Sequence, residues 1–114
     1  MVSYNERLKI GRDSTISGNV FISNVEHNYK EIGVHVLKQD MLEVHTQIGE
    51  NCFIEYGTVI MSGNTLERQC IVGANSVVKG TFPDFSVIAG SPVRVVKKYD
   101  VLTGSWVKVN KEEK

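Results

Sequence analysis

A six-residue period runs through most of this chain and constrains its fold more than any other feature. From Ile48 to Pro83 the sequence reads IGENCF IEYGTV IMSGNT LERQCI VGANSV VKGTFP, and an aliphatic residue opens every block of six. The same phase occurs earlier as IGRDST ISGNVF ISNVEH, which begins at Ile10. A period of six fits neither a helix of 3.6 residues per turn nor a strand with two alternating faces. It fits a solenoid in which each block forms one side of a triangular coil, so the sequence predicts a parallel β-helix.

Three blocks make a coil of 18 residues, and the pattern predicts about three coils in an all-β fold. We expect a single domain over 1–114, with coils at 10–27, 48–65 and 66–83 and a C-terminal cap at 84–110. Glycines follow three of the aliphatic heads, where we expect the backbone to turn through positive φ angles. They are Gly11, Gly49 and Gly73.

The fifth position of most blocks is small, as a tight corner of the coil would require. Cys52 and Cys70 occupy this position one coil apart, so their thiols are expected to stack in the interior as small, unreactive hydrophobic groups rather than as a disulfide. Glu26 and Phe82 break the rule, each in the last block before the repeat is interrupted or ends.

The repeat loses its phase between Ile22 and Ile48, which predicts that residues 28–47 leave the coil as a long excursion loop. Loops of this length in a compact domain are usually functional or disordered. This one carries Val34, Leu37 and Met41 among its apolar residues, so we expect it to pack on a neighbouring subunit.

The C-terminal segment predicts a β-hairpin that covers the end of the coil. Its two alternating strands meet around Leu102-Thr103-Gly104. An end cap is needed because every solenoid exposes its last coil. The apolar residues expected to form it are Val93, Val95, Tyr99, Val101, Trp106 and Val109.

The balanced charge and the hydropathy of the sequence argue against a nucleic-acid partner and against a membrane span. Lys plus Arg and Asp plus Glu number 13 each, so no net charge attracts nucleic acid or a membrane surface. The chain contains no run of 18 apolar residues and does not begin like a signal peptide. The expected compartment is the cytoplasm, with no membrane span.

These features together resemble the hexapeptide-repeat acyltransferases, in particular the O-acetyltransferases of lipopolysaccharide and capsule sugars and the related maltose and galactoside acetyltransferases. The resemblance covers about residues 8–98. It depends on the hexapeptides, on a histidine just before the excursion (NVEHNY) and on the closing run IVGANSVVKGTFPDFSVIAGSPVRVVKK. It implies a left-handed β-helix, a homotrimer with active sites between subunits, acetyl-CoA as acyl donor and no metal.

His27 matches the position of the family's catalytic histidine. Acetyl transfer to a hydroxyl needs a base for the alcohol proton, and an imidazole titrates near neutral pH. The resemblance therefore implies that His27 is the general base; the alternative is a surface histidine at a corner of the coil. For the sugar acceptor, the matched positions are Asn5, Glu26, Gln39 and Phe53, where Phe53 stands in place of a frequent tryptophan.

For acetyl-CoA, the resemblance implies a groove along the coil. Tyr56 is bulkier than the usual small residue there, and Lys79-Gly80 replaces a common Thr-Lys pair. Basic side chains suit the CoA phosphates, because charge-assisted pairs with phosphate are strong. The matched residues are Tyr56, Ala74, Lys79, Gly80, Arg94 and Lys97.

Three alternatives remain at this level. A zinc site of His27, His35 and His45 would resemble γ-type carbonic anhydrases, but their ligand spacing is not reproduced. The same base would serve an amino sugar in N-acetylation. Finally, the chain could be a truncated, catalytically silent β-helix that assembles with a longer paralogue.

Overall fold

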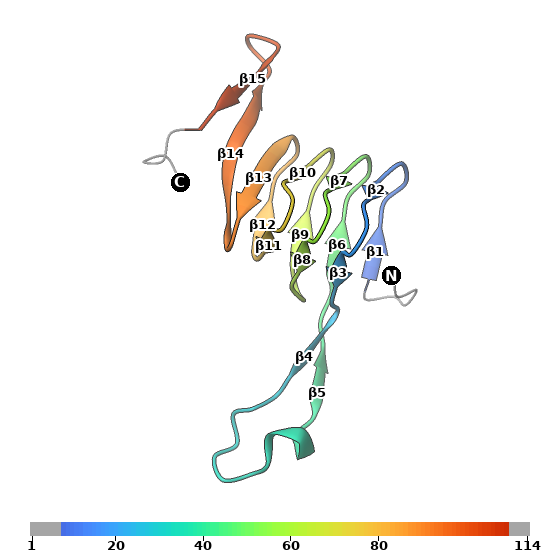
Figure 1. Ribbon diagram of the computed structural model, residues 1–114, viewed down its shortest axis with the longest axis vertical. Coiled ribbons are helices and arrows are strands. Elements are labelled where there is room, and N and C mark those ends of the chain that lie inside the picture. Colours follow the sequence, from blue (N-terminus) through green and yellow to red (C-terminus); the bar gives the residue numbers. More distant parts are fainter. Residues whose placement is uncertain (1–7, 110–114) are drawn as a thin grey trace.

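The backbone winds as a stack of coils from which one long ribbon projects (Figure 1). The structure is a computed structural model and describes residues 8–109. Short parallel strands form the three walls of each coil. Wall 1 contains β1 (Leu8–Ile10), β6 (Thr46–Ile48), β9 (Thr65–Leu66) and β12 (Thr81–Phe82). Wall 2 contains β2 (Thr15–Ile16), β7 (Phe53–Ile54), β10 (Ile71–Val72) and β13 (Ser86–Gly90), and wall 3 contains β3 (Phe21–Ile22), β8 (Val59–Ile60) and β11 (Val77–Val78).

Turns connect the walls at three corners, which are named here for later use. Corner 1 joins wall 1 to wall 2 at residues 11–14, 49–52 and 67–70. Corner 2 joins wall 2 to wall 3 at residues 17–20, 55–58 and 73–76, and corner 3 leads back to wall 1 at residues 61–64 and 79–80.

The aliphatic heads of the six-residue blocks form the core, as predicted. Those of the complete coils are at most 1% exposed: Ile48, Ile54, Ile60, Leu66, Val72 and Val78. Ile22 is also buried, and Ile10 and Ile16 pack against the same cluster. Burial of this column removes apolar surface from water along the whole length of the coil, which is the main stabilising contribution available to a narrow solenoid.

The small residues of the fifth positions connect neighbouring coils at the corners. Ser14 Oγ donates to the carbonyl oxygen of Gly49 over 2.8 Å, and Asn64 Nδ2 donates to that of Val78 over 3.2 Å. The fifth position must therefore be small and able to satisfy buried backbone groups.

Three glycines that follow aliphatic heads were expected to adopt positive φ angles, and this prediction is wrong. Gly11, Gly49 and Gly73 do not adopt positive φ. A Cβ on Gly11 would lie 2.5 Å from the backbone nitrogen of Glu50, and one on Gly49 would lie 2.7 Å from the carbonyl carbon of Glu67. Close approach of successive coils therefore requires these glycines.

The register of the last coil differs from the prediction that Phe82 stands in the column of small residues. Phe82 pairs with Leu66, 16 positions earlier, whereas Leu66 pairs with Ile48 over the regular 18. Corner 3 of this coil is thus two residues short, and Phe82 occupies the position of an aliphatic head. Ser86, which is fully buried, takes the small position that Cys70 holds one coil below.

The excursion is a two-stranded antiparallel ribbon, β4 (Val25–His27) and β5 (Met41–Glu43), with a 3₁₀ turn η1 (Val36–Lys38) near its tip. Leu8 pairs with Thr46 over 38 positions, against 18 between the next coils, so the insertion adds 20 residues. The Val44 N–H donates to the carbonyl oxygen of Asn24 at its base. The inserted segment is therefore 25–44 rather than 28–47, because Thr46 and Gln47 already belong to wall 1 and the chain leaves the coil before His27.

The predicted hairpin at the C-terminal end is confirmed, and the inner part of it covers the coil. β13 pairs with β14 (Val93–Asp100), which pairs with β15 (Ser105–Lys108). Val93 is buried and Val95 packs against the core. The prediction is wrong for Val101, which is 77% exposed because the tip of the hairpin extends beyond the coil (Figure 1). Across residues 8–109 no helix is long and apolar enough to cross a membrane.

Candidate active site

His27 lies in β4 of the ribbon, where it is in register with Met41 of β5. Its side chain is half-buried, and its Nδ1 lies 2.7 Å from the carbonyl oxygen of Asn28. A carbonyl oxygen only accepts hydrogen bonds, so Nδ1 carries the proton of this bond. In the neutral imidazole Nε2 then keeps a free lone pair, which is the form of histidine that accepts a proton.

Asn28 holds the peptide group that orients this imidazole. Its N–H donates to the carbonyl oxygen of Asp40 over 3.0 Å, across the ribbon. Its Oδ1 accepts from the N–H of Lys30 over 3.1 Å. Sequence reasoning missed Asn28, because it acts on His27 through a carbonyl oxygen that every residue possesses.

The two other predicted residues of the ribbon have different surroundings. Glu26 is exposed, and it is in register with Leu42. Gln39 is only 6% exposed: its Nε2 donates to the carbonyl oxygens of Glu31 and Val34, and its Oε1 accepts from the Glu31 N–H. Gln39 therefore closes the tip of the ribbon on itself.

Phe53, Tyr56 and Ala74 lie on wall 2 and corner 2. Phe53 is 38% exposed on the outside of the coil, between Thr15 and Ile71 of the neighbouring strands. Tyr56 is 57% exposed, and Ala74, one coil further, is also exposed. These three residues form an accessible strip on wall 2 and corner 2, whereas the ribbon leaves the coil at corner 3.

The predicted phosphate-binding residues occupy two places. Lys79 and Gly80 are exposed at corner 3, where the Gly80 N–H donates to Asn64 Oδ1. Arg94 and Lys97 are exposed on β14, in register with Ala89 and Val87 of β13. Asn5 lies outside the described residues.

One chain thus brings the predicted residues together only in part. His27 and Glu26 share the ribbon, and Lys79 lies at the corner from which the ribbon leaves. Tyr56 and Ala74 lie at a different corner.

The cysteines are free and buried, as expected. Cys52 Sγ donates to the carbonyl oxygen of Glu67 over 3.1 Å, and Cys70 Sγ to that of Pro83 over 3.2 Å. A side-chain hydrogen bond in which Cys70 is the donor to Cys52, together with burial, raises the pKa of the Cys70 thiol and keeps it protonated. Within the described residues no three His, Cys, Asp or Glu side chains gather as a metal site.

Comparison with known proteins shows which proteins this chain resembles. Residues 45–80 match the family model for the bacterial transferase hexapeptide (six repeats). The chain is 33% identical over 110 residues to a candidate lipopolysaccharide biosynthesis O-acetyl transferase, WbbJ, of Escherichia coli (strain K12), with 90% of this chain and 56% of that protein covered.

Two solved structures share the fold. A maltose O-acetyltransferase from Clostridium difficile 630 superposes with a TM-score of 0.73 at 30% identity, over 80% of this chain and 48% of that one. A galactoside acetyltransferase in complex with coenzyme A superposes with a TM-score of 0.72 at 28% identity, over 91% and 53%. The chain spans about half the length of the relatives that it matches. Residues 45–80 thus carry the bacterial transferase hexapeptide repeat, and the chain shares the left-handed parallel β-helix of these acetyltransferase structures.

Proposed function

We propose that this chain acts as an acetyl-CoA-dependent O-acetyltransferase whose acceptor is a sugar hydroxyl in a polysaccharide or lipopolysaccharide precursor. The relatives are acetyltransferases named for lipopolysaccharide, maltose and galactoside, and one of them is solved with coenzyme A. The observation that carries the proposal is the bond from His27 Nδ1 to the Asn28 carbonyl oxygen, because it leaves Nε2 as a proton acceptor.

In the proposed reaction His27 acts twice. Nε2 removes the proton from the sugar hydroxyl as its oxygen attacks the thioester carbonyl carbon, and a C–O bond forms. The tetrahedral intermediate then collapses, the C–S bond breaks, and the proton passes from His27 to the departing sulfur. The products are the O-acetyl sugar and CoA with a free thiol, so no acyl group is transferred to the protein.

The donor would lie along the accessible strip of Phe53, Tyr56 and Ala74. Tyr56 and Ala74 are exposed along it. Beside it, a Cβ on Gly73 would lie only 3.1 Å from that of Ala89, so this part of the coil has no room for a larger side chain. Arg94 and Lys97 on β14, with Lys79-Gly80 of an adjacent chain, would bind the phosphates. The acceptor would contact Asn5, Glu26 and Phe53, and the buried Gln39 would contribute by holding the tip of the ribbon closed.

We further propose a homotrimer in the cytoplasm with active sites between subunits. In one chain His27 and the donor strip lie at different corners, so a neighbouring subunit would complete the site. The ribbon supports this arrangement, since Ile32 is 96% and Leu37 77% exposed and a second chain would bury both.

A thermal-shift titration with acetyl-CoA tests the proposal. Ligand at 100 times its Kd would add about 2.7 kcal/mol to the free energy of unfolding. No shift at millimolar acetyl-CoA would instead favour a silent β-helix that assembles with a longer relative. If the cofactor binds, His27→Ala is expected to lower kcat by about 10²–10⁴ with the acetyl-CoA affinity unchanged. An unchanged kcat would refute the role of His27.

A further inference from the structure

Corner 1 carries a cavity that the proposed reaction does not use. Its volume is about 360 Å³, and it lies between wall 1 and wall 2, whereas the ribbon leaves the coil at corner 3. Six residues from three successive coils line it: Arg12, Asp13, Glu50, Asn51, Arg68 and Gln69.

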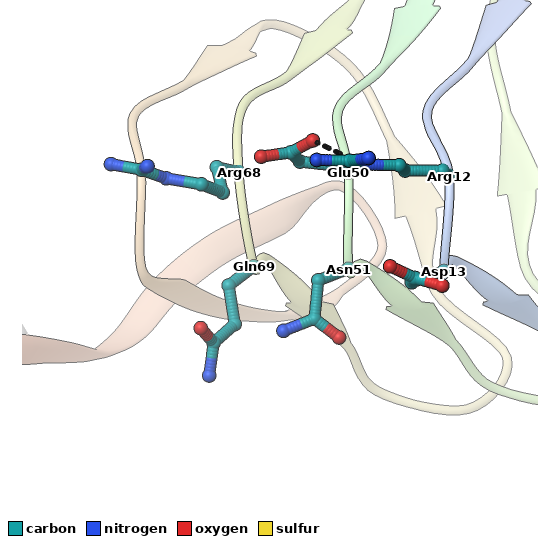
Figure 2. Close-up of a pocket in the computed structure, with 6 residues that line it drawn as sticks. All are labelled: Arg12, Asp13, Glu50, Asn51, Arg68 and Gln69. Carbon is teal, nitrogen blue, oxygen red and sulfur yellow. Dashed lines mark hydrogen bonds and ion pairs between the residues drawn. The ribbon is translucent and has the colours of Figure 1, made fainter.

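Figure 2 shows these side chains as two rows that run along the coil. Both arginines of the charged row are paired: Arg12 Nε lies 3.4 Å from Glu50 Oε2 within the row, and Arg68 Nη2 lies 3.1 Å from Oδ2 of Asp84 outside it. In the second row, Asn51 and Gln69 point away from the first row and Asp13 points along its own row. None of the three makes a side-chain hydrogen bond within residues 8–109. The row offers free donors and acceptors at the coil spacing of about 4.8 Å.

Gln69 adopts the left-handed backbone that recurs at this corner, where Phe85 of the next coil has a φ angle of 61°. The φ angles of Asp13, Asn51 and Gln69 are 63°, 56° and 50°. Asp and Asn tolerate this left-handed region, but Gln gains no such advantage and is disfavoured there. The turn therefore imposes this backbone on successive coils, and the strain alone does not mark a site. What distinguishes Gln69 is a cavity-lining amide that makes no side-chain hydrogen bond within residues 8–109.

Aromatic rings adjoin the row at Gln69. A second cavity of about 270 Å³ is lined by Gln69, Phe85, Tyr99 and Trp106. The ring centroids of Tyr99 and Trp106 are 5.5 Å apart in an edge-to-face arrangement, and those of Phe85 and Tyr99 are 5.9 Å apart. Tyr99 is 37% and Trp106 38% exposed, so both present ring surface to solvent.

We propose that this surface, the corner groove (Asp13, Asn51, Gln69, Tyr99 and Trp106), binds a neutral oligosaccharide. The six residues of the larger cavity carry no net charge, and both arginines are already paired, so the groove gives no preference to an anion. A row of amide and carboxylate groups beside exposed rings matches a ligand with many hydroxyls and an apolar ring face. The groove would give the proposed acetyltransferase a second place to hold a glycan. Its biological role rests on the proposed function, whereas binding at the groove does not require the reaction.

Trp106 is the one tryptophan of the chain, so its fluorescence reports directly on the corner groove. The test is a titration without acetyl-CoA, using hexamers of glucose, galactose, mannose and N-acetylglucosamine, with hexagalacturonate as the anionic comparison. We expect a saturable change with at least one neutral hexamer and none with hexagalacturonate. No saturable change with any neutral hexamer, or a response to the anion alone, would overturn the proposal.

Variants separate a binding role for Gln69 from a structural one. Gln69→Gly relieves the backbone strain and removes the amide, so the melting temperature should rise while glycan affinity falls about threefold to tenfold. Gln69→Asn suits the same φ angle and shortens the side chain, and it should also weaken binding. Wild-type affinity in both variants would refute the assignment.

Two further variants serve as controls. Leu102→Ala, at the hairpin tip, should bind the glycan like the wild type. His27→Ala should also keep glycan binding, so a failure of the corner groove and a failure of the proposed catalysis give different results.

Discussion

Gly49 lies where two successive coils come closest, and its lack of a side chain is a condition for stacking them. A Cβ there would lie 2.7 Å from the Glu67 carbonyl carbon, and backbone atoms cannot move aside as a flexible side chain would. By contrast, a Cβ on Gly18 would meet the ring of Tyr56 at 3.5 Å, an ordinary contact.

We therefore expect Gly49→Ala to lower the free energy of unfolding by about 1–3 kcal/mol, as overpacking does. Gly18→Ala is the matched control and should change it by less than about 0.5 kcal/mol. Chemical denaturation of the two variants measures the difference. Equal stabilities would mean that the coils separate without cost, against the close packing described above.

The thiols of Cys52 and Cys70 give a second prediction at this scale. Both are buried, and the raised pKa of Cys70 disfavours its thiolate, which is the reactive form. The hydrogen bond with Cys70 lowers the pKa of Cys52 to about 7, so that thiol is protected by its burial alone. A thiol-reactive dye should modify neither cysteine in the folded protein faster than the chain unfolds, and both after denaturation. An added cysteine at the exposed position 102 (Leu102→Cys) is the control and should react at once. Rapid labelling of the wild type would contradict the burial of this pair.

At the scale of elements, one side chain holds the tip of the ribbon closed. Gln39 makes three hydrogen bonds to the backbone of Glu31 and Val34 near the tip. The packing of the coil lies elsewhere, so the tip should open without unfolding the molecule, in the manner of a locally unstable unit.

Gln39→Leu leaves these backbone groups without partners, and we expect local opening to become easier by about 1–3 kcal/mol. Trypsin should then cleave faster after Lys30 and Lys38, which flank the tip, while the midpoint of global unfolding stays within error. Lys79→Gln, at an exposed position on the coil, is the control and should leave cleavage within the ribbon unchanged. A lower midpoint of global unfolding for Gln39→Leu would show that the ribbon and the coil unfold together.

The period of six predicted the interior of the coil, because the spacing within the repeat alone decides which residue of each wall points inward. It did not predict the position of Phe82, since corner 3 between Val78 and Thr81 is two residues shorter than in the previous coil and only the pairing of Phe82 with Leu66 reveals it. The base of the ribbon was displaced by three residues for a similar reason: strand pairing between Glu26 and Leu42 extends the excursion into the last block of the repeat. Hydrophobic periodicity is local, whereas register is decided by the neighbouring coil.

The candidate site was predictable to a lesser degree than the fold. His27 was found through its resemblance to a motif, but the Asn28 carbonyl oxygen that fixes its tautomer leaves no mark in the sequence. Gln69 was missed because nothing in a single sequence shows that its φ angle is 50°. Contacts made by backbone atoms and strain in a turn become visible only in three dimensions.

At the scale of the whole molecule, the position of His27 on a projecting ribbon and of Ala74 at corner 2 predicts active sites shared between subunits. A cyclic trimer has heterologous interfaces, so each site would combine His27 from one chain with the donor strip of the next. Two kinds of inactive trimer test this arrangement: one carries His27→Ala, and the other carries Ala74→Trp, which obstructs the donor strip at an exposed position.

When equal amounts of the two variants are dissociated together and reassembled, subunits combine at random. A site is intact only where an Ala74→Trp chain supplies His27 and a His27→Ala chain supplies the donor strip, which happens at about a quarter of the interfaces. Activity should therefore return to about a quarter of that of wild-type protein treated in the same way, while each variant reassembled alone stays inactive. If His27 and the donor strip of the same chain formed the site, the mixture would remain as inactive as its parts, because every chain carries one of the two defects.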